Sequence, residues 1–205
     1  KNGEKLLVIG RAGIGLDNVD VNAATEQGVM VVNAPKSNIL SAAEHTIALI
    51  LAQARNIPQA NSALKSGRWE RNEWTGVELA DKTLGIIGLG RIGKLVAQRA
   101  LAFGMNLVAY DPFVATERAR QLSVQLMSLE ELIQVSDFLT IHVAKTPETE
   151  NLINAELLSR AKPSLRIINV ARGGIVNEVD LAEAVTTGKI AGAAIDVFEN
   201  EPVTE

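Results

Sequence analysis

The chain has 205 residues, of which 47% are hydrophobic and 21% charged, with a formal net charge of −4 and no cysteine. This composition is typical of an α/β protein, and the mild negative charge argues against nucleic acid or a membrane surface as the main partner. A disulfide framework and a thiolate metal site are excluded, and we expect a cytoplasmic protein without a metal.

Two strands and three helices are predicted before residue 81. Their predicted ranges are strands at 6–10 and 29–35, and helices from near Asp20, from Ser41 to about Arg55, and from about Pro58 to Gly67. The second of these helices is predicted to begin at Ser41 because "SAAE" (Ser41–Glu44) has the spacing of a capping box. The polar stretch 67–76 then carries both tryptophans, Trp69 and Trp74.

From residue 83 onward, apolar runs of strand length alternate with helical patterns, which indicates βαβ units and a parallel sheet. The predicted ranges are strands at 83–87, 106–110, 137–143, 165–171 and 191–196, and helices at 91–103, 129–134, 155–160 and 178–187. A second capping box stands at Ser128–Glu131, and Gly104 and Gly188 occupy C-cap positions. We therefore predict an α/β fold with a doubly wound parallel sheet.

The stretch "LGIIGLGRIG" predicts a dinucleotide-binding loop. Gly88, Gly90 and Gly93 follow an apolar strand and open a helix, so the three glycines suit a tight turn, close approach to a pyrophosphate and tight helix packing. Asp111 ends the next strand, where an acidic residue binds ribose hydroxyls, and Pro112 follows without a nearby cation for a 2′-phosphate. We expect NAD rather than NADP. The alternative is a glycine turn without a ligand.

Polar residues follow several predicted strands, where open parallel sheets bind ligands. Arg172, before two glycines, could hold a carboxylate or phosphate, although a surface arginine fits equally well. Asp196 and Glu201 could steer a nicotinamide amide and raise the pKa of a histidine base, or form a solvated acidic loop. His142 could touch NAD, but its apolar neighbours fit a structural histidine as well, and we expect His45 to be a packing or surface residue.

Several segments in a fixed order carry a family resemblance. They are "GRAGIGLDNVD", "SNILSAAEHT", "SGRWER", "LGIIGLGRIG", "NVARGGIV" and "GAAIDVFENEP". Together they resemble the D-isomer-specific 2-hydroxyacid dehydrogenases, in particular the phosphoglycerate-oxidising members, over essentially the whole chain. The resemblance implies a Rossmann-like NAD-binding domain, oxidation of 3-phosphoglycerate to 3-phosphohydroxypyruvate with NAD in serine biosynthesis, and assembly as homodimers or tetramers.

The resemblance also implies roles for individual residues. Arg172 matches the arginine that orients the substrate, and Glu201 matches the glutamate that pairs with the catalytic histidine. The expected cofactor contacts are Gly88, Gly90, Arg91, Ile92, Gly93, Asp111, Pro112, His142, Val143, Val170, Ala171, Arg172 and Asp196. The expected substrate contacts are Arg11, Gly13, Asn38 and Arg71, with Arg71 offered from the neighbouring subunit.

Some positions depart from the family pattern. Ile14, Val143 and Val170 stand where some relatives carry threonine or cysteine, so side-chain hydrogen bonds at these positions are lost. The family's histidine base lies in a "P-H-x-G-A"-type segment beyond "EP", and neither His45 nor His142 matches it. We therefore expect a piece of a longer protein that lacks its proton acceptor and is inactive alone.

The expected domain organisation follows the same resemblance. Residues 1–34 correspond to a remnant of a flavodoxin-like substrate domain, and residues 35–205 to the NAD-binding domain, with a dimerisation helix and arm at 37–80. Trp69 and Trp74 would anchor a homodimer, or else cover local helix ends. Two alternative functions stay open: another D-2-hydroxyacid dehydrogenase, such as a glyoxylate or hydroxypyruvate reductase, and an NAD-sensing corepressor.

Overall fold

The computed structural model describes residues 5–16 and 18–203, and the chain divides into two compact units, Lys1–Ala42 and Ala43–Glu205. In the first unit, strands β1 (Val8–Arg11) and β2 (Met30–Asn33) pair in parallel, with helix α1 (Val21–Glu26) between them in the chain. The helix begins as predicted, because the Asp20 carboxylate accepts a hydrogen bond from the Ala23 N–H at 2.9 Å.

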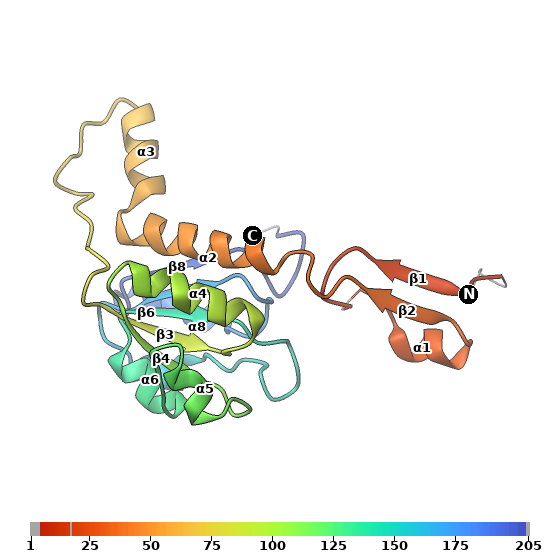
Figure 1. The fold of residues 1–205 in the computed structure, drawn as a ribbon. Coiled ribbons are helices and arrows are strands. Elements are labelled where there is room, and N and C mark those ends of the chain that lie inside the picture. Colours follow the sequence, from red (N-terminus) through yellow and green to blue (C-terminus); the bar gives the residue numbers. More distant parts are fainter. Residues whose placement is uncertain (1–4, 17, 204–205) are drawn as a thin grey trace. The chain divides into compact units, whose positions relative to one another are not determined.

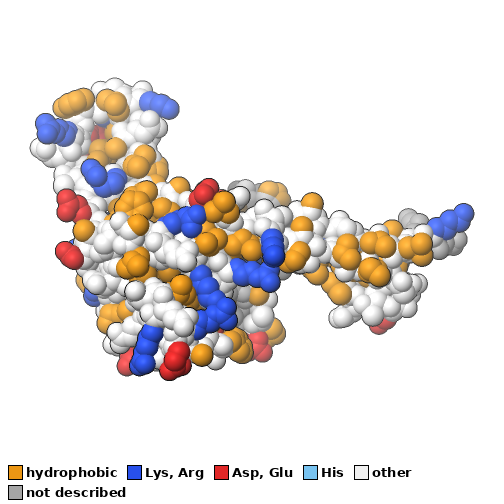
Figure 2. Space-filling model, in the orientation of Figure 1, with side chains coloured by type: hydrophobic (Ala, Val, Ile, Leu, Met, Phe, Trp, Pro, Cys, Tyr) orange, Lys and Arg blue, Asp and Glu red, His pale blue; other side chains and the backbone are white. Residues whose placement is uncertain are grey.

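The sheet of the first unit exposes much of its apolar surface. Leu7 is 76% and Met30 61% exposed, and Figure 2 shows hydrophobic side chains gathered over these strands. An isolated two-stranded sheet is marginally stable in water, so this unit depends on further packing for its stability.

The second unit is a six-stranded parallel sheet in the order β5-β4-β3-β6-β7-β8 (Figure 1). Its strands are β3 (Thr83–Ile87), β4 (Asn106–Tyr110), β5 (Val124–Leu126), β6 (Phe138–Ile141), β7 (Arg166–Asn169) and β8 (Gly192–Ile195). The helices that follow α1 are α2 (Ile39–Ala54), α3 (Ile57–Lys65), α4 (Arg91–Ala102), α5 (Thr116–Arg120), α6 (Leu129–Val135), α7 (Ala155–Ser159) and α8 (Glu178–Thr186). This strand order is that of the doubly wound dinucleotide-binding fold, with its switch point between β3 and β6, and the predicted fold class is confirmed.

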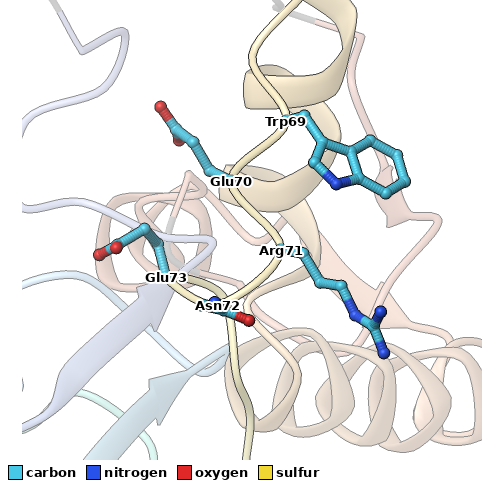
Figure 3. Close-up of a pocket in the computed structure, with 5 residues that line it drawn as sticks. All are labelled: Trp69, Glu70, Arg71, Asn72 and Glu73. Carbon is cyan, nitrogen blue, oxygen red and sulfur yellow. The ribbon is translucent and has the colours of Figure 1, made fainter.

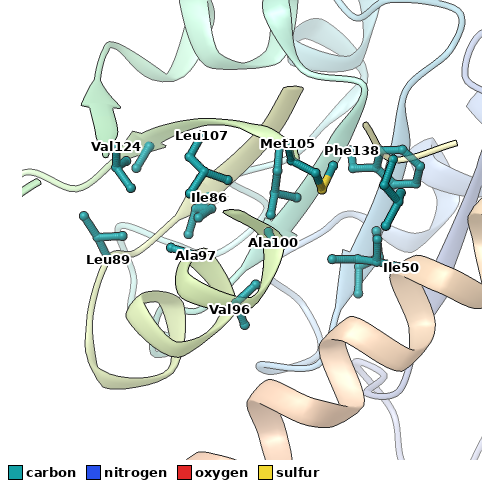
Figure 4. Packing of buried hydrophobic residues seen from close by; sticks show 14 of the residues in the cluster. Ile50, Ile86, Leu89, Val96, Ala97, Ala100, Met105, Leu107, Val124 and Phe138 are labelled. Atoms are coloured by element: carbon teal, nitrogen blue, oxygen red, sulfur yellow. The ribbon is translucent and has the colours of Figure 1, made fainter. Parts of the chain in front are cut away.

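Two hydrophobic clusters cover the two faces of this sheet. Ile86 of β3 packs in one cluster with Ile50 of α2 and Val96 of α4, as Figure 4 shows. Ile87, the next residue of the same strand, packs in the other cluster, which includes Leu132 of α6 and Leu181 of α8. Because successive side chains of a strand point to opposite faces, β3 is buried on both sides and reads as a continuous apolar run.

The structure corrects one predicted helix boundary and confirms another. Helix α2 begins at Ile39, where the Asn38 carbonyl already accepts a hydrogen bond from the Ala42 N–H at 3.0 Å. The capping box predicted at Ser41–Glu44 is therefore wrong, since "SAAE" lies inside the helix. The capping box at Ser128–Glu131 is confirmed, with both reciprocal hydrogen bonds present at the start of α6.

Two elements between residues 113 and 128 escaped the sequence analysis. Helix α5 has 5 residues and strand β5 has 3, so neither is long enough to show a clear hydrophobic period. Strand β6 ends at Ile141 rather than at residue 143, which places His142 just beyond the strand. Gly104 and Gly188 end their helices with positive φ angles of 74° and 70°, as predicted.

Candidate functional site

The loop after β3 has the backbone geometry that its glycines predict. Gly88 has a φ of 89°, in the left-handed region that favours glycine. A Cβ on Gly93 would lie 2.1 Å from the Gly88 carbonyl oxygen, whereas a Cβ on Gly90 would meet no atom within 4 Å. Gly88 thus makes the turn, Gly93 allows the helix to approach the strand, and Gly90 leaves open space beside the backbone for a ligand.

Helix α4 starts directly after this loop. Gly90 is its N-cap, and within the described residues no side chain caps the helix and no acidic residue lies in its first turn. Arg91, the first helical residue, is exposed, while Ile92 packs against the core. The backbone amides of the first turn and the positive end of the helix dipole therefore favour an anion such as a pyrophosphate at this end.

Asp111 lies between the glycine loop and the end of β4. One carboxylate oxygen accepts the Leu89 N–H at 2.8 Å, and the other accepts the Phe113 N–H at 2.9 Å. Each oxygen retains a lone pair for a further donor such as a ribose hydroxyl. Pro112 and Phe113 are exposed beside it, so the structure adds no cation next to this carboxylate in the chain.

The end of β6 forms the other wall of the glycine loop. A Cβ on Gly88 would lie 2.7 Å from the His142 carbonyl oxygen and 2.8 Å from Cγ1 of Val143. The His142 imidazole lies 3.0 Å from the Thr140 hydroxyl, and burial lowers the pKa of His142 to about 4. His142 therefore carries a neutral ring engaged with its own strand, and its backbone is the part that contacts the loop.

The turn after β7 is held by one buried amide. The Asn169 side chain accepts the Ala171 N–H at 3.0 Å and donates to the Arg172 carbonyl at 2.9 Å. Val170, Ala171 and Arg172 are all partly buried here, and the Arg172 guanidinium donates to the Ala171 carbonyl at 2.6 Å. Asn169 thus fixes the backbone from which the predicted substrate arginine projects.

The loop after β8 packs directly on this turn. A Cβ on Gly173 would lie 1.9 Å from the Phe198 backbone, so only glycine permits the contact. Within the loop, the Glu201 carboxylate accepts the Phe198 N–H at 3.0 Å, and the Glu199 N–H donates to Glu178 of α8 at 2.6 Å. The structure therefore holds the two predicted catalytic residues, Arg172 and Glu201, on segments in van der Waals contact.

Asp196, at the start of this loop, has a partner that the sequence analysis did not predict. Its backbone N–H donates to the Asn169 carbonyl at 3.0 Å. Its carboxylate lies 3.4 Å from Nε2 of His45 on helix α2, and both side chains are about half exposed (53% and 45%). His45 is therefore a surface residue as expected, but it stands against a predicted cofactor residue.

The remaining predicted substrate residues belong to other segments of the chain, three of them to the first unit. Arg11, at the end of β1, donates to the Asn18 side chain at 3.1 Å and packs beside the buried Gly13; Asn38, in the same unit, is exposed. Arg71 lines an open hollow of about 440 Å³ formed by residues 69–73. Figure 3 shows its side chain on the same side of the segment as Trp69, with Glu70 and Glu73 directed to the other side.

Sequence reasoning missed the contacts that Asn169 and His45 make with predicted site residues. Asn169 is 2% exposed, and its one sequence signal is a polar residue at the end of an apolar strand. His45 gives no signal, because nothing in the sequence relates position 45 to position 196. In the described residues, no cluster of His, Cys, Asp and Glu suits a metal ion, and no helix is long and apolar enough to cross a membrane.

Comparison with known proteins shows the family of the chain. Residues 47–205 match the family model described as "D-isomer specific 2-hydroxyacid dehydrogenase, NAD binding domain". A D-3-phosphoglycerate dehydrogenase of Mycobacterium tuberculosis is 54% identical over 201 residues, which are 98% of this chain and 38% of that protein. One of Synechocystis is 53% identical, with coverage of 99% of this chain and 37% of that protein. The chain thus spans less than half the length of these relatives.

A solved structure shows the same arrangement of elements. D-lactate dehydrogenase from Aquifex aeolicus, complexed with NAD and lactic acid, superposes with a TM-score of 0.87 at 36% sequence identity. The match covers 96% of this chain and 59% of that structure.

Proposed function

The chain belongs to the D-isomer-specific 2-hydroxyacid dehydrogenase family, whose NAD-binding domain it carries, and from this premise we propose that NAD binds along the carboxyl edge of its six-stranded sheet. The main support is the open space beside the Gly90 backbone together with the Asp111 carboxylate. The Leu89 N–H, which donates to Asp111, holds this carboxylate next to the glycine loop. A pyrophosphate and its adjoining ribose need these two partners at one site.

Each part of the coenzyme binds at a different place along the carboxyl edge of the sheet. Gly88, Gly90 and Gly93 with the amides of α4 hold the pyrophosphate, Arg91 and Ile92 flank it, and Asp111 and Pro112 receive the adenosine ribose. The nicotinamide end then lies toward the ends of β6, β7 and β8, against residues 142–143, 170–172 and Asp196. This placement follows the two-fold division of the sheet, in which each half takes one nucleotide.

For the whole protein, we propose the oxidation of 3-phosphoglycerate to 3-phosphohydroxypyruvate. The support is the identity of 53–54% to proteins named D-3-phosphoglycerate dehydrogenase, against 36% to the D-lactate dehydrogenase. Oxidation of a secondary alcohol removes a hydride, which NAD accepts when bound, and a hydroxyl proton, which a general base must take. Arg172 orients the substrate carboxylate, Glu201 positions the base, and Arg11, Gly13, Asn38 and Arg71 bind the substrate.

The same premise gives the organisation of the molecule. Residues 1–34 belong to a substrate domain and residues 35–205 to the NAD-binding domain. The helix and arm at 37–80 form a homodimer, and Arg71 of this arm is offered to the neighbouring subunit. A water-soluble coenzyme and a small anionic substrate fit an enzyme of the cytoplasm.

Isothermal titration of the purified chain with NAD and with NADP tests the coenzyme assignment. We expect NAD to bind more tightly by about tenfold or more, because a 2′-phosphate would meet the Asp111 carboxylate and no adjacent cation. Tighter binding of NADP, or binding of neither nucleotide, would overturn the proposal.

A further inference from the structure

Helix α2 is fixed along the edge strand β8. Among the described strands β8 is at the edge of the sheet, and the Gln53 side chain of α2 donates to its Ala193 carbonyl at 2.6 Å. A Cβ on Gly192 would lie 2.8 Å from the same Gln53 side chain, so helix and strand are in close contact. Ala43, Ile50 and Ala54 are buried on the inner side of the helix. The helix is therefore in direct contact with this strand.

The contact between His45 and Asp196 lies further along the same pair of elements. His45 precedes Gln53 on α2 by roughly 12 Å of helix, and Asp196 follows Ala193 by roughly 10 Å of extended chain. The helix thus runs antiparallel to the strand, and its turn at His45 lies at the carboxyl edge of the sheet. Nε2 of His45 meets Oδ1 of Asp196 there at 3.4 Å.

The acidic residue next to His45 has a different charged partner, so it does not compete with Asp196 for the imidazole. Glu44, beside His45 on α2, lies 3.8 Å from the Arg99 guanidinium of α4. The Asp196 backbone is held by Asn169 of β7, and its carboxylate meets His45. Since both side chains of the pair are about half exposed, a ligand at this edge can reach the second carboxylate oxygen.

We infer that His45 is a positioning residue for the nicotinamide end of the coenzyme. Its imidazole holds one oxygen of Asp196 and turns the other toward the sheet edge, where a carboxylate accepts the N–H groups of the nicotinamide carboxamide. This inference rests on the proposed binding of NAD. An imidazole with its proton on Nε2 is a donor at that atom, so His45 can donate to the carboxylate.

Titration of the full 205-residue chain with NAD and with ADP-ribose separates this role from a general effect on binding. ADP-ribose keeps the adenosine, both ribose rings and both phosphates but lacks the nicotinamide. We expect His45→Ala to weaken NAD about three- to tenfold, the range of one lost hydrogen bond, and to change ADP-ribose less than about twofold. His45→Gln, which keeps an N–H donor, should restore most of the NAD affinity.

Two further variants sharpen the comparison. Glu44→Ala removes a charge from the adjacent position of the same helix and should change neither affinity. In an Asp196→Asn background, His45→Ala should weaken NAD by less than it does in the wild-type chain, because residues that act together are not additive. If the alanine variant does not fold, His45→Leu and His45→Gln form a second pair, of which only the leucine variant should lose NAD affinity.

The outcomes distinguish the inference from the function on which it rests. Equal loss of NAD and ADP-ribose in His45→Ala would show a structural role and overturn the inference, as would no loss of either. In both of those cases the wild-type chain still binds NAD and the proposed function stands. Binding of neither ligand by the wild-type chain would overturn the proposed function and this inference with it.

Discussion

The Leu89 backbone N–H donates to the Asp111 carboxylate at 2.8 Å. This bond joins the middle of the glycine loop, after β3, to the end of the neighbouring strand β4. It gives Asp111 a role in the unliganded fold, since the carboxylate holds the loop whose amides are proposed to receive the pyrophosphate. The same side chain is thus a structural anchor and the proposed ribose ligand.

Replacement of Asp111 separates these two roles. Asp111→Asn keeps an acceptor for the Leu89 amide but removes the charge, whereas Asp111→Ala removes both. A hydrogen bond to a charged group contributes about 1.5–3 kcal/mol, so we expect NAD affinity to fall about 10- to 100-fold in the alanine variant and less in the asparagine variant. Titration calorimetry measures this, with Glu117→Ala on the exposed first turn of α5 as control. Unchanged affinity in Asp111→Ala would contradict the prediction.

Two glycines of the loop should respond oppositely to the same substitution. Gly90→Ala places a Cβ in open space with a φ of −74°, so the free energy of unfolding should change by less than about 0.5 kcal/mol. NAD affinity should nevertheless fall about tenfold or more, because the new methyl group occupies the space proposed for the pyrophosphate.

Gly93→Ala places its Cβ 2.1 Å from the Gly88 carbonyl oxygen and should destabilise the fold by about 1–3 kcal/mol. Urea unfolding and NAD titration of both variants test the contrast. A Gly90→Ala protein that binds NAD normally would show that the ligand does not approach this position.

His142 should make the stability of the chain sensitive to mild acid. Burial lowers its pKa from 6.5 to about 4 in the folded protein, so between these values the unfolded chain binds a proton that the folded chain does not. The free energy of unfolding should therefore fall as the pH drops from about 6.5 to 4, by about 3 kcal/mol at most.

In His142→Gln this contribution should disappear. Urea unfolding at several pH values between 4 and 7.5 compares the variant with the wild-type chain, and the difference in unfolding free energy should depend on pH only in that window. Parallel curves for the two proteins would contradict a buried neutral histidine.

The fold was predictable from the sequence where its elements are long and buried on both faces. The apolar run at β3, the glycine loop and Asp111 belong to one local strand–turn–helix–strand unit, so their spacing alone predicted them. Helix α5 and strand β5 were missed because they are too short to show a period. The start of α2 was misplaced because a capping-box pattern also occurs inside helices.

Contacts between distant segments were harder to predict. The pair His45–Asp196 joins residues on α2 and after β8, and only the packing of that helix against the edge strand brings them together. His142 shows a different limit. The sequence left open a cofactor contact and a structural role, and the choice depends on a ring orientation toward Thr140 that the residue order does not encode.

The arm at residues 67–76 should carry part of a homodimer interface. Trp69 is 81% exposed, and the Trp74 indole N–H is buried without a hydrogen-bond partner among the described residues. Trp69, being exposed, contributes little to the stability of a monomer, but tryptophans in interface centres often contribute about 2 kcal/mol or more to binding. Trp69→Ala should therefore raise the dissociation constant of the dimer about 30-fold or more. The free energy of unfolding of the monomer should stay unchanged.

Arg71 provides the matched control, because it lies two residues from Trp69 on the same side of the segment (Figure 3). If it serves the partner's substrate site, Arg71→Ala should leave the dimer intact, whereas Trp69→Ala combined with Trp74→Ala should give monomers. Light scattering at tens of micromolar measures the three species. A monomeric wild-type chain at these concentrations would refute the interface, and an Arg71→Ala monomer would assign the arginine to assembly instead of to the substrate.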